Sequence, residues 1–351
     1  MSNLQLLIDD KIYTGWTGVR VMRSMEMIAD AFELSLTDKW GVKGLSAADI
    51  KTGMACSIEI DGELVITGYI DEALPEYNAT SHTVKVAGRS LAGDLVDCSL
   101  QSKQFTNTGL LKLATEHCKP FGIDVSADVD VGKPFRTIAR EDGQPIHEFL
   151  ERAARIRVVR LVSQPEGNLL ITRAGDKHIE TALVLGENIR AASGQFTTRE
   201  RFSDYIVQGQ NTAWDTNSGE ASAGLRYTVK DERWPTGRYR PKVVLAEENV
   251  DIDDCVKRAT WQRNTAFGRS QGIVYTVSGW RHQGGLWLPN RLVPIQDQWM
   301  GIERELLTVS TQFLLDKEGE RTEIRVMPKE AFNLDPLPEP DDTSLWGPAP
   351  Q

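Results

Sequence analysis

Histidine, cysteine and the common nucleotide-binding motifs are scarce or absent in this sequence. Its 351 residues include five histidines and four cysteines, and none of them stands in an HxxxH or CxxC pattern. The glycine-rich patterns GxGxxG and GxxxxGK[ST], which cradle phosphates, do not occur either. Because zinc sites and dinucleotide sites depend on such spacings, we expect no metal site and no cofactor.

Long apolar runs and disulfide patterns are also lacking. No stretch approaches the roughly 20 apolar residues of a membrane span, and the first residues lack the basic and apolar regions of a signal peptide. The widely spaced Cys56, Cys98, Cys118 and Cys255 are expected to be buried free thiols of a chain that folds in a reducing compartment. The sequence thus predicts no membrane span.

Positive charge is not in excess. Lys and Arg number 40 and Asp and Glu number 50, which gives a net charge of −10. Residues 335–351 hold four acidic residues and no basic one, so the rest of the chain is only mildly acidic. This balance argues against a dedicated nucleic-acid binder.

Two patterns approach catalytic motifs without meeting them. Residues 88–93, GRSLAG, nearly form the GxSxG elbow of α/β-hydrolases, but the second glycine comes one residue late and the long alternation of strands and helices is missing. Adjacent carboxylates, as at Glu141-Asp142 and Asp253-Asp254, do not show the pair across a cleft that a glycosidase needs. We therefore expect no catalytic residue.

The first part of the chain is patterned as short strands. Phe32, Leu34 and Leu36 share one face of a strand, with polar residues between them. Asp61-Gly62 separates two alternating runs and suits a type I′ turn, because both of its positions need positive φ. Several short strands with turn signals between them predict a small barrel or sandwich.

Helical patterns follow, and strands then return. Helices are expected at residues 107–119, 144–155 and 253–267. Asn107 or Thr108 can cap the first helix, Pro145 suits the first turn of the second, and Gly268 is placed to end the third. Strands are expected at residues 158–162, 169–172, 202–210, 272–278, 287–295, 306–315 and 322–326.

Together these patterns predict a mainly β protein with α/β parts. Two small β-barrel domains are expected at residues 1–97 and 177–332, with a helix-plus-hairpin α/β module inserted at 98–176. A further loop and helix insertion is expected at about 211–270. Residues 333–351 are proline-rich and acidic, and we expect a flexible tail there.

One stretch interleaves basic and aromatic residues. Residues 226–242, RYTVKDERWPTGRYRPK, carry six cations around Tyr227, Trp234 and Tyr239. Such a pattern can grip phosphates and stack bases, but Asp231 and Glu232 interrupt it. We favour a loop that contacts protein, with aromatic and arginine anchors.

Several blocks of the sequence carry a resemblance to a known family. A strand ending in Gly88-Arg89-Ser90 leads into a short helix, residues 91–96, for which Ser90 is the expected N-cap. Further marks are Asp94 and Asp97, then Tyr205 and Gly209 in FSDYIVQGQ, and then Trp287, Pro289 and Asn290. In these motifs the chain resembles the baseplate hub proteins of Mu-like contractile-tailed phages.

The resemblance implies a structural protein of the virion tail baseplate, made in the host cytoplasm. It implies a homotrimer whose two barrels per chain form a ring of six, between a sixfold tail tube and a threefold spike. Expected partners are other copies of the chain, the tail tube protein, the spike protein and other baseplate proteins. Phage DNA would pass through the ring without specific binding.

Two alternatives stay open at the level of sequence. One is a spike-associated cell-wall hydrolase, and the other is the hub part of a type VI secretion spike. Self-association is independently favoured by tryptophans in turn-rich surroundings, where full burial within one domain is not expected. These residues are Trp16, Trp214, Trp234 and Trp287.

Overall fold

The computed structural model describes most of the chain. The described residues are 2–9, 11–37, 49–79, 82–101, 103–175, 177–210, 225–234, 237–249 and 252–332. The expected loop at 211–224, with Trp214, and the expected tail at 333–351 lie outside them. Within the described residues the chain is mainly β, with four α-helices.

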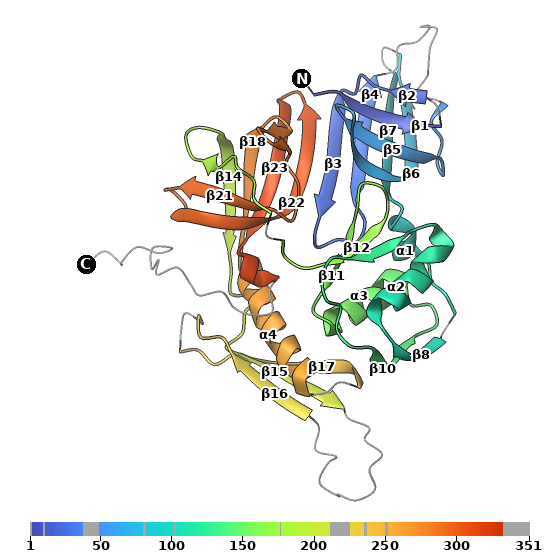
Figure 1. Ribbon diagram of the computed structural model, residues 1–351. Helices are drawn as coiled ribbons and strands as arrows, with labels where there is room; N and C mark the ends of the chain where they lie inside the picture. Colours follow the sequence, from blue (N-terminus) through green and yellow to red (C-terminus); the bar gives the residue numbers. More distant parts are fainter. Residues whose placement is uncertain are drawn as a thin grey trace, which may run out of the picture.

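One sheet of 13 strands runs through both β-rich parts of the chain (Figure 1). Its N-terminal strands are β1 (Leu4–Ile8), β2 (Lys11–Tyr13), β3 (Gly18–Ser24), β4 (Ala31–Thr37), β5 (Ala55–Ile60), β6 (Glu63–Tyr77) and β7 (His82–Ser90). Its C-terminal strands are β13 (Leu183–Val184), β14 (Ile189–Phe196), β18 (Gln271–Ser278), β21 (Leu292–Asp297), β22 (Ile302–Asp316) and β23 (Gly319–Met327). The two sets join where β22 pairs antiparallel with β3, with Phe313 opposite Val21.

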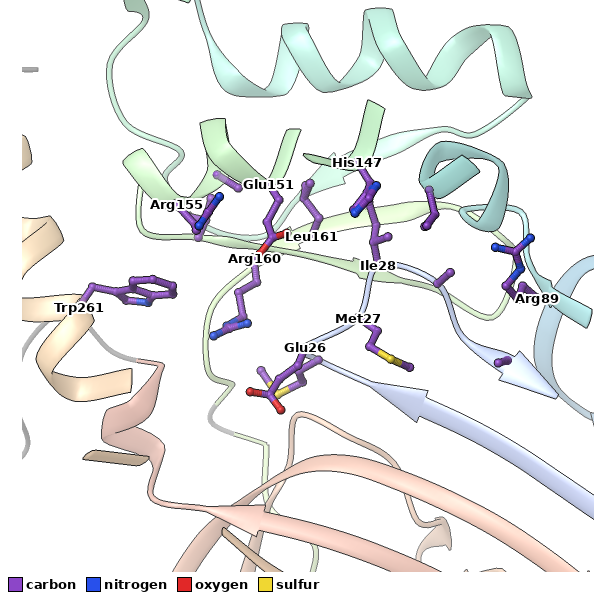
Figure 2. A pocket seen from close by; sticks show the side chains of 16 residues that line it. Glu26, Met27, Ile28, Arg89, His147, Glu151, Arg155, Arg160, Leu161 and Trp261 are labelled. Atoms are coloured by element: carbon purple, nitrogen blue, oxygen red, sulfur yellow. The ribbon is translucent and has the colours of Figure 1, made fainter. Parts of the chain in front are cut away.

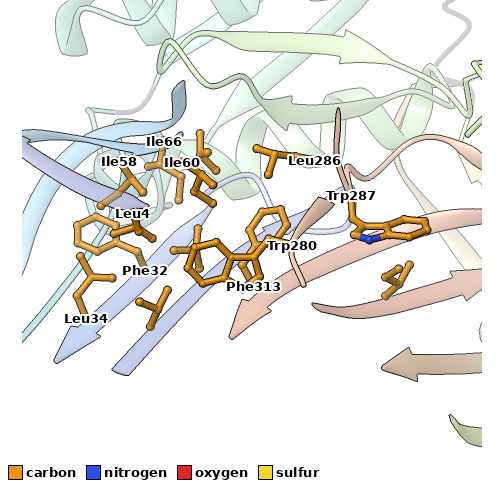
Figure 3. Packing of buried hydrophobic residues seen from close by; sticks show 14 of the residues in the cluster. Leu4, Phe32, Leu34, Ile58, Ile60, Ile66, Trp280, Leu286, Trp287 and Phe313 are labelled. Atoms are coloured by element: carbon orange, nitrogen blue, oxygen red, sulfur yellow. The ribbon is translucent and has the colours of Figure 1, made fainter. Parts of the chain in front are cut away.

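The core of this sheet is a single cluster to which both sets of strands contribute. Figure 3 shows Phe32 and Ile58 from the N-terminal strands near Trp280 and Phe313 from the C-terminal part. Period-2 patterning produces this arrangement, because alternate residues of each strand point to the same face. Strand β1 illustrates it, since Leu4, Leu6 and Ile8 are buried and the residues between them are half-buried.

The α/β module follows β7 and has its own core. It contains α1 (Gly93–Asp97), β8 (Lys103–Thr108), α2 (Leu110–Cys118), a 3-10 turn (Lys119–Phe121), β9 (Val125–Ala127), β10 (Phe135–Arg140), α3 (Ile146–Ile156), β11 (Arg160–Ser163) and β12 (Leu169–Thr172). The apolar face of α3, with Phe149 and Leu150, packs into a second cluster.

A smaller sheet and the longest helix stand between β14 and β18. They comprise β15 (Asp204–Gln210), β16 (Leu225–Lys230), β17 (Pro241–Asn249) and α4 (Ile252–Arg269). The short strands β19 (Arg281–His282) and β20 (Gly285–Leu286) pair with each other, and the 3-10 helix η3 (Lys329–Ala331) ends the described chain against α4. Gly268 makes this contact possible, because a Cβ there would lie 2.0 Å from the Cβ of Ala331.

Much of the local prediction is confirmed. The hairpin at Asp61-Gly62 joins β5 to β6, with φ of 53° and 80° at the two turn residues. The terminal hairpin of β22 and β23 and the helix-hairpin order of α3, β11 and β12 also form as expected. All four cysteines are free, and three of them are buried while Cys98 is half-buried.

Other predictions were wrong in ways that have physical reasons. The 13-stranded sheet follows an open hydrogen-bonded path, and the described strands form no closed barrel, so the two expected barrels are not shown. Asn107 and Thr108 lie in β8 and Gly109 is the N-cap of α2, while Gly268 lies inside α4 rather than beyond it. Trp16 and Trp287 are buried at 7% and 2% exposure, because neighbouring strands cover them.

Candidate functional site

The Gly88-Arg89-Ser90 motif at the end of β7 connects several elements and does not cap the helix that follows. Ser90 does not cap α1, whose N-cap is Ala92 without a side-chain bond. Instead the Ser90 hydroxyl is buried, accepting the Asp30 N–H at 3.1 Å and the Ser163 hydroxyl at 3.1 Å. The residue therefore connects β7 to the β3–β4 loop and to β11.

Asp30 anchors the same joint through a buried ion pair. Its carboxylate lies 3.1 Å from Nε of Arg23 and accepts the N–H of Ser24 at 3.3 Å. Burial raises the pKa of Asp30 above its ordinary value, and the neighbouring Arg23 guanidinium opposes that shift. Removing the Asp30 carboxylate would leave the buried Arg23 charge without its partner, which strongly destabilises a folded protein.

Arg89 and Asp97 form the outer side of the motif. Arg89 donates to Asp71 at 2.6 Å and to both carboxylate oxygens of Asp97, at 2.6 and 3.2 Å. The hydrogen bond from Arg89 lowers the pKa of Asp97, and these bonds raise the pKa of Arg89. Asp94 occupies the first turn of α1, where a carboxylate favours the helix N-terminus.

Tyr205 and Gly209 lie on β15, the central strand of the small sheet. Tyr205 is fully buried, and its hydroxyl accepts the Phe202 N–H at 3.1 Å while the two rings meet edge to face. Burial raises the pKa of Tyr205 to about 12. The phenol is thus a packing residue that is held neutral.

The basic and aromatic residues around Trp234 stack on one another inside this insertion. Arg240 lies over the rings of Phe202 and Trp234, and Trp234 donates its indole N–H to the Arg238 carbonyl at 2.7 Å. Arg201 is held by Asp231 at 2.6 Å. Several cations near the stretch 226–242 are therefore engaged within the chain, as cation–π partners or ion pairs.

Trp287, Pro289 and Asn290 build a third joint. Asn290 has φ of 58°, and its carboxamide accepts the Gly175 N–H at 2.6 Å and donates to the Arg173 carbonyl at 3.3 Å. Trp287 is buried beside His282, and Pro289 is buried as well. This turn ties the end of the α/β module to the C-terminal strands.

The three motifs do not converge on one site, and the described residues show no metal cluster. Within them, no group of three His, Cys, Asp or Glu side chains could hold a metal ion. No helix in the described part of the chain is long and apolar enough to cross a membrane.

A pocket of about 450 Å³, which the sequence did not predict, lies between the β3–β4 loop, α3, β11 and α4 (Figure 2). Apolar side chains form much of its wall, from Met25, Met27, Ile28, Val159, Leu161 and Trp261. The only local sign in the sequence is the methionine-rich run at 22–27, since methionine suits adaptable surfaces.

Basic side chains reach into the same pocket. Arg160 lies 5.6 Å from the ring of Trp261 and 4.6 Å from that of Phe332, and burial lowers its pKa to about 10. Buried nitrogen atoms of Arg160, Arg155 and His147 have no hydrogen-bond partner. A pocket with an apolar wall and unpaired donors can bind an acidic, partly apolar segment.

Comparisons with known proteins match most of the chain to one group of phage baseplate proteins. Residues 3–90 match the Mu phage baseplate assembly protein GpP-like N-terminal family, residues 92–173 the baseplate hub protein gp44-like second domain, and residues 253–335 the Mu phage GpP fourth domain. Over 345 residues the chain is 32% identical to baseplate hub protein gp44 of Escherichia phage Mu, covering 95% of this chain and 89% of the relative.

The chain belongs to the Mu phage baseplate hub protein gp44-like family.

Solved structures agree with this family. The 43 kDa tail protein of prophage MuSo2 from Shewanella oneidensis is 39% identical and superposes with a TM-score of 0.83, covering 94% of this chain and all of that one. The E. coli c3393 protein, a component of the type VI secretion system, shares the fold at a TM-score of 0.59, with 9% identity, 92% of this chain and 76% of that one covered.

Membership in this family shows what class of protein the chain is. The gp44-like family consists of structural hub proteins of the phage tail baseplate, not enzymes. The chain is therefore a structural component of a phage tail baseplate, and the hydrolase alternative is set aside.

Proposed function

We propose that three copies of this hub protein form a closed ring that adapts a sixfold tail tube to a threefold spike. In this proposal residues 1–97 and 177–332 are the two β modules of each chain, so that three chains place six modules around the axis. Residues 98–176 form the module between them, and the tail tube, spike and other baseplate proteins are the partners.

Family membership and the open 13-stranded sheet are the observations that support the proposal. The hydrogen-bonded path of this sheet begins at β14 and ends at β2, so the sheet has two different edge strands. A ring needs heterologous contacts, in which one patch meets a different patch on the next copy. An open sheet with unlike ends supports such head-to-tail contacts.

Exposed apolar side chains further support association. Among the described residues, the most exposed of these side chains are Tyr77 at 83%, Trp299 at 81%, Tyr239 at 75% and Leu245 at 69%. Aromatic residues are enriched at the centres of protein interfaces. Trp234, in contrast, is half-buried within its own chain and is a weaker contact candidate than the sequence suggests.

The channel of this ring is proposed to let phage DNA pass without binding it. The mildly acidic chain supports this, because a basic lining would hold phosphates through counterion release. The fold shared with a type VI secretion component is a likeness of architecture at 9% identity, and it supports no second function.

Light scattering over a dilution series tests the ring. We expect a trimer, or a monomer–trimer equilibrium that shifts with concentration. A single dimeric mass across the series, or a monomer at every concentration, would contradict closure of the ring by this chain alone.

A further inference from the structure

The pocket between α3, β11 and α4 has arginine donors and a histidine ring nitrogen that the fold leaves unsatisfied. Nε of Arg155, Nε and Nη2 of Arg160 and Nδ1 of His147 are buried and have no hydrogen-bond partner. Buried polar groups are nearly always paired, because an unpaired one keeps its full desolvation cost. The pocket therefore suits an occupant that brings hydrogen-bond acceptors.

The charges around the pocket favour an anionic occupant. Glu26 is already paired with Arg325 at 2.6 Å and with Arg269 at 3.6 Å, and Arg89 is paired with Asp71 and Asp97. Glu151 lines the rim but is exposed. The guanidiniums of Arg155 and Arg160 thus outnumber the acidic groups that remain to neutralise them.

The described chain ends beside Arg160, one of the residues that line this pocket. Phe332 is buried, and the Arg160 guanidinium stacks on its ring at 4.6 Å. The preceding turn is fixed to α4, because Thr265 donates to the Ala331 carbonyl at 3.0 Å. The last described residue, Phe332, is therefore fixed beside Arg160.

We propose that the acidic C-terminal segment of this chain, residues 333–351, docks in the pocket formed by the β3–β4 loop, α3, β11 and α4. Its carboxylates accept from Arg155 and Arg160, and its apolar side chains lie against the methionine and Trp261 wall.

The composition and reach of the segment fit this pocket. It carries four carboxylates and no cation, at Asp335, Glu339, Asp341 and Asp342, and apolar side chains at Leu334, Leu337, Leu345 and Trp346. Three extended residues span at most about 11 Å, so Asp335 stays close to Phe332 and hence to Arg160. Tethering raises the local concentration of the segment, and its prolines reduce the entropy lost on docking.

Carboxyl footprinting of the full chain tests the proposal. Carbodiimide-driven labelling of Asp335, read by mass spectrometry, is compared with labelling of a free peptide of residues 333–351. We expect labelling in the chain to be slower by about tenfold, the ratio that 1.4 kcal/mol of docking produces. The Arg155→Gln/Arg160→Gln variant should label at nearly the rate of the peptide, and the exposed Arg190→Gln control should remain slow.

A second variant protects the test against misfolding of the first. Replacing all four acids by amides (Asp335→Asn, Glu339→Gln, Asp341→Asn, Asp342→Asn) leaves every described residue unchanged. We expect amide exchange in α3 and β11 to become faster in this variant by about the same factor.

Three outcomes would overturn the proposal. Asp335 that labels as fast in the chain as in the free peptide excludes docking. Protection that disappears on dilution places the segment in a neighbouring copy instead. Pocket protection that arises only in an assembled baseplate, with the segment fully labelled, assigns the pocket to another baseplate protein.

Discussion

At Gly88 the backbone of β7 passes so close to β6 and β4 that no side chain fits. A Cβ at this position would lie 2.1 Å from the Tyr69 carbonyl oxygen and 2.6 Å from the ring of Phe32. The glycine of the Gly-Arg-Ser motif is therefore required by packing. Its neighbours serve the same joint, Ser90 through its buried hydroxyl and Arg89 through two carboxylates.

Gly88→Ala is expected to destabilise the protein by about 1–3 kcal/mol, the usual cost of overpacking a filled core. Chemical denaturation followed by tryptophan fluorescence measures it. Gly109→Ala is the matched control, because a Cβ at Gly109 meets no atom within 4 Å. Equal stability of the two variants would show that the backbone at Gly88 moves apart at little cost.

His117 predicts a defined pH dependence of stability. Its ring is buried between Phe105 and Phe149 and donates from Nδ1 to the Leu113 carbonyl at 2.7 Å. Burial lowers its pKa below the ordinary value of 6.5, so the unfolded chain takes up the proton first. This contribution to stability is present above pH 6.5 and is lost as the pH falls from there through the folded-state pKa.

The His117→Gln variant should therefore lose less stability than the wild type between pH 7.5 and 5. Unfolding midpoints across this range measure the difference. Some slope remains in the variant, because burial also lowers the pKa of His282. Identical slopes in the two proteins would mean that His117 does not contribute.

At the scale of elements, local signals predicted hairpins well and helix ends poorly. Asp61-Gly62 has one favourable geometry, so its turn could be read from two residues. The start of α2 could not be predicted in this way. Thr106 and Thr108 pair with β10 and so place Asn107 in β8, and the local sequence does not encode this pairing. Gly268 lies within α4, where the packing of Ala331 leaves no room for a Cβ.

Contacts between segments that are distant in the chain could not be predicted from the sequence either. The pairing of β3 with β22 joins residues almost 300 positions apart, and period-2 patterns carry no information about partners. The pocket beside Arg160 has the same origin, since its walls come from segments near residues 25, 155 and 261.

The shared core predicts that both ends of the chain loosen together. Phe313 is fully buried, lies opposite Val21 and packs near Trp280. Phe313→Ala should cost about 3–5 kcal/mol, as for other core phenylalanines. Hydrogen exchange should then accelerate in β3 and β4 as well as in β18 and β23.

Phe149→Ala is the matched control for this prediction. Phe149 is equally buried but belongs to the core of the α/β module. We expect its loss to accelerate exchange mainly in α2, α3 and β10. If Phe313→Ala affected only the C-terminal strands, the two β parts would be energetically independent despite their common sheet.

At the scale of the whole molecule, we expect poor DNA affinity. The chain carries a net charge of −10, and Arg201, Arg240 and Lys242 stack on aromatic rings of their own chain. Fluorescence anisotropy with duplex DNA at about 0.15 M salt, the physiological ionic strength, measures it. Micromolar affinity at that salt would restore residues 226–242 as a nucleic-acid site.

Electron microscopy of the purified protein, and of the particle that contains it, can show the proposed ring of three copies. We expect a hollow ring with threefold symmetry, built from three copies that each contribute two β modules. A solid particle, a ring of another symmetry, or three copies that meet through a single β module each would contradict it.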